Sequence, residues 1–127
     1  MQQLAFALDL KDDPALIAEY EAWHRPEQIW PAILESLKAS GITELRIFRT
    51  GPRLFLLLEA PDDFSVQAKA RADAASTEVQ AWEKLMWRFQ QALPWAQPDQ
   101  KWVPMQPIFS LRQCLAGAAS EPRASPS

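Results

Sequence analysis

The sequence predicts an α+β fold with the ferredoxin-like order strand, helix, strand, strand, helix, strand, built around one four-stranded antiparallel sheet. Short apolar segments bounded by turn residues indicate the strands, and segments with apolar residues three or four positions apart indicate the helices between them. The 127 residues suffice for one core but not for two ordinary domains. We therefore expect a single domain over residues 1–115.

The first strand and the first helix follow each other directly. Residues 4–10 alternate loosely and are apolar on both faces, which is typical of a buried strand. Asp12 and Asp13 then provide an N-cap, and Pro14 suits an early helical position. Apolar residues at helical spacing continue the pattern, so we expect this helix to end near Trp23.

The middle of the chain predicts a second helical stretch and a β-hairpin. After two prolines, apolar residues at helical spacing lead to Ser40-Gly41, a natural C-cap. Residues 42–50 and 53–59 flank the turn Gly51-Pro52 and form the hairpin. Because the run from Leu54 to Leu58 is continuously apolar, we expect the second strand to be buried on both faces.

Two helices and a closing strand are predicted in the second half. Residues 65–75 are alanine-rich and indicate a short helix, and Thr77 to Gln80 matches the capping box of the next one. The apolar stripe of that helix turns Trp82 inward and leaves Trp87 on a different face. Residues 102–111 predict a last strand, which two prolines either confine to a sheet edge or break.

Two remaining segments are polar or poor in apolar residues. Gln90-Gln91 is most simply interpreted as solvated helix surface. Residues 116–127 consist mainly of small residues and proline and have little to bury, so we expect a disordered C-terminal tail.

The predicted sheet also indicates a partner. Helices cover one face of such a sheet, and a strand that is apolar on both sides cannot place all its side chains under them. An uncovered apolar face usually marks an interface. We therefore expect a symmetric homodimer in which the open faces of two sheets meet.

Composition argues against several classes of function. Lys and Arg number 13 against 16 Asp and Glu, so the net charge is −3, and neither nucleic acid nor an anionic membrane surface is an expected partner. Cys114 is the single cysteine, which gives no intramolecular disulfide and, with one histidine, no expected metal site. Since neither a signal-peptide pattern nor a transmembrane-length apolar run is found, we expect a cytoplasmic protein.

The strongest candidate for chemistry is His24, the only histidine, one helical turn after Tyr20, the only tyrosine. Its unperturbed pKa lies near neutrality, so it can accept and donate a proton in one cycle, and the dipole of the preceding helix is expected to raise that pKa. Phosphate-binding loops, zinc motifs and nucleophile elbows are missing. Six tryptophans favour a carbohydrate site, although a histidine at this position is also often a simple helix cap.

A set of short motifs, in order and spacing, resembles the L-rhamnose mutarotase family and its relatives that act on other 6-deoxy-L-sugars such as L-fucose. The resemblance covers about residues 4–111. The motifs begin with Ala5-Phe6 and continue with Tyr20, His24, Pro26, Trp30-Pro31, Leu37-Lys38, Ser40-Gly41, Ile47-Phe48, Leu54-Phe55 to Glu59, Thr77-Glu78-Val79, Trp82, Lys84-Leu85-Met86 and Ile108-Phe109-Ser110-Leu111.

The resemblance implies a dimeric α+β barrel that interconverts the α and β anomers of a free 6-deoxy-L-hexose without a cofactor. His24 would correspond to the family's proton donor and Tyr20 to its sugar-contacting tyrosine. Trp82 would match the first of two adjacent sugar-binding tryptophans, and Trp30, close after His24, is a further expected contact. A residue of near-neutral pKa suits both directions of this proton transfer.

The chain departs from the family pattern around the expected sugar. Glu83 replaces the second tryptophan, Leu45 replaces a tyrosine, Glu27 and Gln28 lengthen a loop, and the region of residues 69–75 is enlarged. A carboxylate at position 83 can accept hydrogen bonds from hydroxyls of different stereochemistry, which favours L-fucose slightly over L-rhamnose. Two alternatives stay open: a non-catalytic sugar-binding dimer, and a small monooxygenase of similar dimeric architecture.

Overall fold

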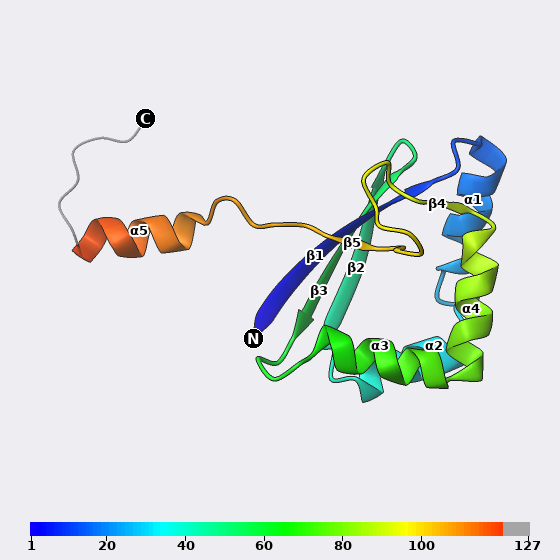
Figure 1. The fold of residues 1–127 in the computed structure, drawn as a ribbon, viewed down its shortest axis with the longest axis horizontal. Helices are drawn as coiled ribbons and strands as arrows, with labels where there is room; N and C mark the ends of the chain where they lie inside the picture. Colours follow the sequence, from blue (N-terminus) through cyan, green and yellow to red (C-terminus); the bar gives the residue numbers. More distant parts are fainter. Residues whose placement is uncertain (121–127) are drawn as a thin grey trace.

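The computed structural model describes residues 1–120, which form one sheet, four helices on one side of it and a fifth helix on an extended arm (Figure 1). The elements, in chain order, are β1 Gln2–Leu10, α1 Pro14–Trp23, α2 Pro31–Ala39, β2 Glu44–Thr50, β3 Arg53–Ala60, α3 Val66–Ala75, α4 Thr77–Trp87, β4 Gln90–Gln91, β5 Val103–Pro104 and α5 Leu111–Ser120.

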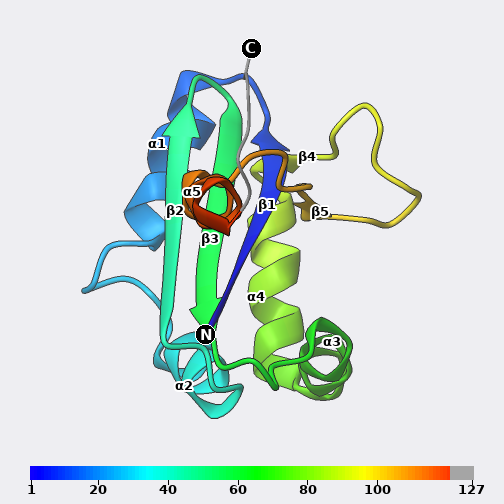
Figure 2. The same ribbon diagram turned by 90° about the vertical axis from the view of Figure 1, so that its left-hand side faces the viewer.

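The sheet is antiparallel throughout and has the order β2-β3-β1-β4, with β5 also paired to β1. Figure 2 shows α1, α2 and α4 behind β2, β3 and β1, so these helices cover a single face. The predicted α+β class is therefore confirmed. None of the helices within the described residues is long and apolar enough to cross a membrane.

The two faces of the sheet differ in burial. On the helix-covered face, Leu8 and Leu54 are almost completely buried. On the open face, Phe55 pairs across the strands with Ala7 and Phe48, and its ring stacks on that of Phe48 at 5.7 Å. Phe55 is only partly buried and Phe48 is exposed, so β3 is not buried on both faces within one chain as its sequence predicted.

Helices α1 and α4 each begin at a residue whose side chain caps the helix N-terminus. Asp13 caps α1 as predicted, and its carboxylate accepts hydrogen bonds from the backbone N–H of Ala15 at 2.9 Å and Leu16 at 3.2 Å. For α4 the prediction was one residue late, because Ser76 is the N-cap and its hydroxyl accepts from the Val79 N–H at 3.2 Å.

The closing strand predicted over residues 102–111 is broken, which is one of the two outcomes that its prolines allowed. Only Val103 and Pro104 pair with β1, and the Met105 N–H makes one more bond to Ala5 O at 2.8 Å. The two prolines of this segment have no N–H to continue a ladder. The chain then leaves the sheet, with Ile108 93% exposed, and α5 projects away from the body of the protein (Figure 1).

The C-terminal segment 116–127, expected to be a disordered tail, begins inside α5. Its residues up to Ser120 are helical, whereas residues 121–127 lie outside the described part of the chain.

Gln90-Gln91 is not helix surface as predicted. Helix α4 ends at Trp87, and the two glutamines form β4, which pairs with Asp9 and Leu10 of β1. Gln90 is buried at 4% exposure, whereas Gln91 is exposed. One of the two side chains therefore faces the interior, under the helices.

Candidate active site

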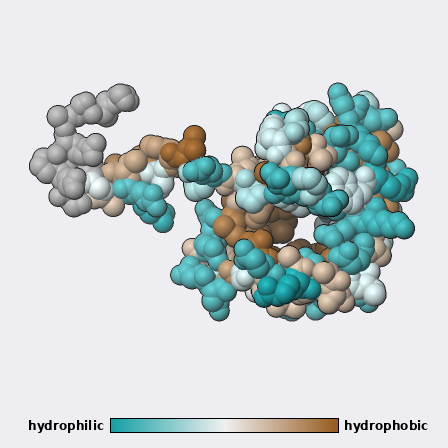
Figure 3. Space-filling view, viewed as in Figure 1, coloured by the Kyte–Doolittle hydropathy of each residue, from teal (hydrophilic) through white to brown (hydrophobic). Residues whose placement is uncertain are grey.

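A cavity of about 870 Å³ lies between the helix-covered face of the sheet and helices α1, α2 and α4. In Figure 3 the mouth of this hollow opens between the helices and the sheet, and its visible walls are hydrophobic. Four of the five predicted site residues line it, namely Tyr20, His24, Trp82 and Glu83. A cavity of this size and apolar character is typical of small-molecule sites.

His24 is held in one orientation by the end of α1. It is the C-cap residue of that helix, and its ring Nδ1 lies 2.7 Å from the carbonyl oxygen of Tyr20. In the neutral ring, Nδ1–H donates to this carbonyl, so the lone pair resides on Nε2. His24 therefore offers the cavity a proton acceptor on a fixed ring.

The pKa of His24 is lowered below its usual value of 6.5, because burial disfavours the charged ring more than the hydrogen bond to Tyr20 favours it. The sequence-based expectation that the helix dipole raises this pKa is wrong for that reason. At neutral pH the ring is uncharged and ready to accept a proton.

Tyr20 lies beside His24 on the floor of the cavity. The two ring centroids are 4.4 Å apart, and Tyr20 is 3% exposed. Burial raises the pKa of Tyr20 to about 12, against the opposing effect of a hydrogen bond from Gln90. The phenol therefore stays protonated at neutral pH and can donate a hydrogen bond.

Trp82 points inward from α4, as its place on the apolar stripe predicted, and is 8% exposed. Its ring meets His24 at 5.6 Å, Trp30 at 5.2 Å and Trp23 at 6.5 Å, in each case edge to face. Trp30 is the one predicted site residue that does not line the cavity, and it packs against Trp82. Trp82 is thus both a wall of the cavity and the centre of an aromatic cluster.

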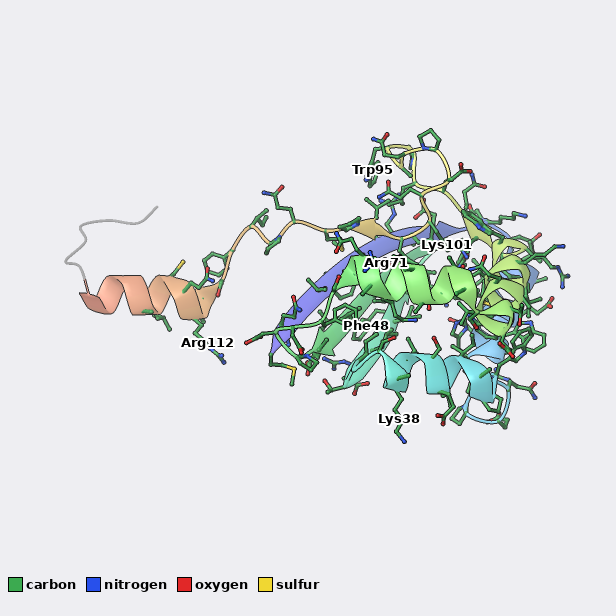
Figure 4. The ribbon with its side chains drawn as sticks, turned by 60° about the horizontal axis from the view of Figure 1, so that its bottom comes forward. Lys38, Phe48, Arg71, Trp95, Lys101 and Arg112 are labelled. Carbon is green, nitrogen blue, oxygen red and sulfur yellow. The ribbon has the colours of Figure 1, made fainter. Side chains whose placement is uncertain are left out.

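Glu83 lines the cavity next to Trp82 and is partly buried. Its carboxylate accepts a hydrogen bond from Gln80 Nε2 at 3.2 Å. The ammonium group of Lys101 donates to the Glu83 backbone carbonyl at 3.3 Å and lies 4.9 Å from the centre of the Trp87 ring. Lys101, labelled in Figure 4, reaches this place from the segment before β5.

Sequence analysis missed several polar residues of the cavity. Ser36, Lys69 and Asp73 form a hydrogen-bonded cluster that joins α2 to α3, and the i, i+4 spacing of Lys69 and Asp73 was a readable signal. Gln90 and Lys101 also line the cavity. For these two the sequence holds no comparable local signal, because the fold alone brings them beneath the helices.

The arrangement suits a neutral, hydroxyl-rich ligand. A histidine acceptor, a phenol donor and an amide stand beside an indole wall, and indole faces stack on the C–H face of a sugar ring. Within residues 1–120, no group of three or more His, Cys, Asp or Glu side chains is placed to hold a metal ion. Proton transfer to and from a bound sugar is the chemistry that these residues support.

Comparison with known proteins identifies the family of the chain. Residues 3–111 match the family described as L-rhamnose mutarotase. The chain is 50% identical over 116 residues to the L-fucose mutarotase of Xanthomonas campestris pv. campestris, an alignment that covers 91% of this chain and 93% of that protein. It is 46% identical over 48 residues to the L-rhamnose mutarotase of Acidiphilium cryptum, covering 38% of this chain and 42% of that protein.

Solved structures agree on the fold. The crystal structure of an L-rhamnose mutarotase from Formosa agariphila superposes with a TM-score of 0.64 at 23% identity, covering 87% of this chain and 99% of that one. Tetracenomycin F2 cyclase from Streptomyces glaucescens follows with a TM-score of 0.54 at 18% identity, covering 87% and 98%. At these identities the likeness concerns the fold alone.

The family match covers most of the chain, and it confirms both the resemblance found in the motifs and the expected isomerase class, since mutarotases are isomerases. The match favours mutarotation over the monooxygenase that fold analogy alone had suggested. This chain belongs to the L-rhamnose mutarotase family.

Proposed function

We propose that this protein interconverts the α and β anomers of a free 6-deoxy-L-hexose, with L-fucose favoured over L-rhamnose, and that it does so without a cofactor. The observation that carries the proposal is the neutral His24, oriented through Nδ1 and set beside Tyr20 in a cavity walled by Trp82. The family match and the L-fucose mutarotase of Xanthomonas campestris support the same reaction class.

The proposed reaction is a reversible ring opening. The anomeric hydroxyl gives its proton to Nε2 of His24 while the C1–O5 bond breaks, and the electron pair of that bond moves to O5. The ring oxygen takes a proton from a water molecule admitted to the open cavity, while the Tyr20 hydroxyl stays protonated and donates a hydrogen bond to the sugar. The aldehyde then turns about the C1–C2 bond, and closure on its other face returns both protons to their starting atoms.

The preference for L-fucose rests on the cavity wall. Glu83 and Leu45 both line the cavity, and they stand where the family pattern has aromatic residues. A carboxylate accepts hydrogen bonds from sugar hydroxyls, whereas an indole offers a stacking face. We propose that the carboxylate in place of an aromatic ring selects a sugar whose hydroxyl groups are oriented to donate hydrogen bonds to Glu83.

Anomer exchange in solution tests the function directly. With L-fucose and L-rhamnose in separate samples, saturation of one anomeric proton signal should transfer to the other at a rate that rises with protein concentration. The L-fucose rate should rise more steeply. If a sugar binds but its anomers exchange at the buffer rate, the protein is a sugar-binding module and not a mutarotase.

We also propose that the protein is a homodimer joined through the open face of the sheet. This face presents Phe48 and Phe55, and α5 stands away from it at the end of the arm (Figure 1). The arm that follows β5 adds exposed apolar side chains, among them Ile108 and Phe109. A second copy would cover both sets of side chains, as expected of an apolar patch of this kind.

Phe48→Glu should convert the dimer into a monomer. The wild-type protein should sediment at about twice the chain mass of 14.4 kDa, and the variant near 14.4 kDa, because a carboxylate on this face would be buried unpaired in the interface. Val66→Glu is the matched control, since Val66 is an exposed apolar residue that belongs to helix α3 and not to the sheet. A wild-type mass near that of one chain would contradict the proposal.

A further inference from the structure

We infer that Gln90 is a specificity-determining residue of this site, and that its side-chain oxygen together with the Tyr20 hydroxyl holds one hydroxyl of the sugar. The inference rests on the proposed mutarotase function and adds a residue to it. Gln90 was no part of the sequence motifs that identify the family.

The side-chain oxygen of Gln90 is the first observation. Gln90 lines the cavity at 4% exposure, and its Oε1 atom is buried with no hydrogen-bond partner among the described residues. A buried amide oxygen without a partner is unfavourable, and native structures hold few of them, so each calls for an explanation. A ligand hydroxyl in the cavity would supply the missing donor.

The other end of the same amide supplies the second observation. Gln90 Nε2 donates to the hydroxyl oxygen of Tyr20 at 3.5 Å. Because Nε2 has no lone pair to accept a proton, the Tyr20 hydroxyl hydrogen must be directed elsewhere. The rings of His24 and Phe89 pack against the Tyr20 ring at 4.4 Å and 6.1 Å, and Tyr20 lines the cavity, so a ligand hydroxyl in the cavity can accept this hydrogen.

The two atoms therefore form a matched set, which we name the Tyr20–Gln90 pair. Tyr20 offers a hydrogen and Gln90 Oε1 offers a lone pair, and a sugar hydroxyl both accepts and donates. An apolar group at this place would leave both atoms unsatisfied. The pair is thus built to detect the presence of a hydroxyl on one carbon of the sugar ring.

A pair of this kind discriminates strongly between a sugar and the deoxy analogue that lacks the bound hydroxyl. A site that hydrogen-bonds a substrate hydroxyl rejects the analogue that lacks it by factors of up to about 10⁴–10⁵, because the polar groups of the site remain buried and unpaired. The amide N–H of Gln90 has a second effect, since by donating to the Tyr20 oxygen it leaves the phenol hydrogen free for the sugar. Loss of Gln90 should therefore weaken both contacts with that hydroxyl.

The test uses Gln90→Met, which keeps the length of the side chain and removes both polar atoms. Its matched control is Gln91→Met, the exposed neighbour in the same strand. Anomer exchange is measured with L-fucose and with its 2-deoxy, 3-deoxy and 4-deoxy analogues. We expect the wild type and Gln91→Met to reject one analogue by about 10²-fold or more in kcat/KM. Gln90→Met should not distinguish that analogue from L-fucose.

Tyr20→Phe provides a second and independent variant. If the pair holds one hydroxyl, Tyr20→Phe must lose discrimination against the same analogue as Gln90→Met, whatever its effect on the exchange rate. Because only the phenol oxygen is removed, this variant keeps the ring that packs against Phe89 and stays informative if Gln90→Met does not fold. Loss of discrimination at a different carbon would contradict the inference.

The outcomes separate this inference from the proposed function. If the wild type accelerates exchange and Gln90→Met keeps the wild-type discrimination, Gln90 is only a structural partner of Tyr20 and the inference is wrong. If the wild type accelerates exchange of no sugar, the proposed function fails. Binding of the same four sugars, measured by saturation-transfer difference NMR, then decides whether the Tyr20–Gln90 pair recognises a hydroxyl.

Discussion

His24→Ala is expected to lower the rate of anomer exchange by about 10²–10⁴-fold, the usual contribution of a positioned acid–base group. The expectation follows from the position of the ring, because Nδ1 is committed to the Tyr20 carbonyl and Nε2 is left to the cavity. Exchange between the two anomeric proton signals of L-fucose is the measurement. Sugar binding should persist, since Trp82 and Tyr20 remain.

Arg25→Ala is the control for this variant, because Arg25 is the exposed neighbour of His24 and does not line the cavity. It should exchange anomers at the wild-type rate. A His24→Ala protein that is folded and fully active would remove His24 from the mechanism and shift attention to Tyr20.

The pH profile tests the same residue in the wild-type protein. Burial lowers the pKa of His24, so the neutral, proton-accepting ring persists below pH 6.5. We expect kcat/KM to stay level as the pH falls to 6.5 and to decline only below it. A midpoint at or above pH 6.5 would contradict the burial seen here.

The free energy of unfolding should also decrease as the pH falls below 6.5. Because the folded-state pKa lies below that of the unfolded chain, the folded state binds fewer protons between the two values. The contribution is fully present above pH 6.5 and is lost as the pH falls through the lowered pKa. Unfolding free energies of the wild type and His24→Gln across this range should converge at low pH.

Local patterns predicted the parts of the fold that local physics determines. Asp13 and Pro14 start α1 because a carboxylate cap and a fixed φ act within one turn. Gly51 turns the hairpin with a positive φ of 53°, a conformation that glycine adopts at no steric cost. The inward face of Trp82 followed from helical periodicity in the same way.

The features that sequence patterns did not predict depend on contacts between residues far apart in the chain. The segment after Val103 has enough apolar residues for a strand, but its prolines cannot complete a ladder, so it leaves the sheet. Gln90 is polar and its burial depends on β4 pairing with β1, which no local pattern encodes. The pKa of His24 was predicted from the helix dipole alone, whereas the surrounding aromatic rings set its direction.

Trp30 illustrates the limit of motif reasoning for the site. Its closeness to His24 in sequence predicted a sugar contact, but its ring packs on Trp82 at 5.2 Å and is not among the cavity walls. Trp30 is therefore connected to the cavity through its ring contact with Trp82. A substitution at either tryptophan is expected to shift the side chain of the other.

Trp82→Ala is expected to lower the free energy of unfolding by about 3–5 kcal/mol, the range for removing a large buried aromatic residue. The side chain is 8% exposed and contacts three other aromatic rings. Chemical denaturation gives the measurement. Trp87→Ala on the same helix is the control, since Trp87 is exposed and its contact with Lys101 contributes about 0.5–1 kcal/mol.

The same substitution is expected to weaken sugar binding by about 1–3 kcal/mol, because an interface residue that supplies a buried aromatic contact has effects of this size. Trp82→Phe separates binding from folding, since a smaller ring preserves part of the packing and removes the indole face. A folded Trp82→Phe protein with wild-type affinity would show that the indole does not stack on the sugar.

Trp82 should also set the pH range of catalysis, since its ring lies 5.6 Å from that of His24 and is part of what buries it. Removing the indole admits water to His24, so its pKa should rise towards 6.5 and the acidic limb of the pH profile should move up with it. If Trp82→Ala binds sugar more weakly but the acidic limb of its pH profile does not move, Trp82 only holds the sugar. If the acidic limb moves to higher pH and sugar affinity is unchanged, Trp82 only shields His24 from water.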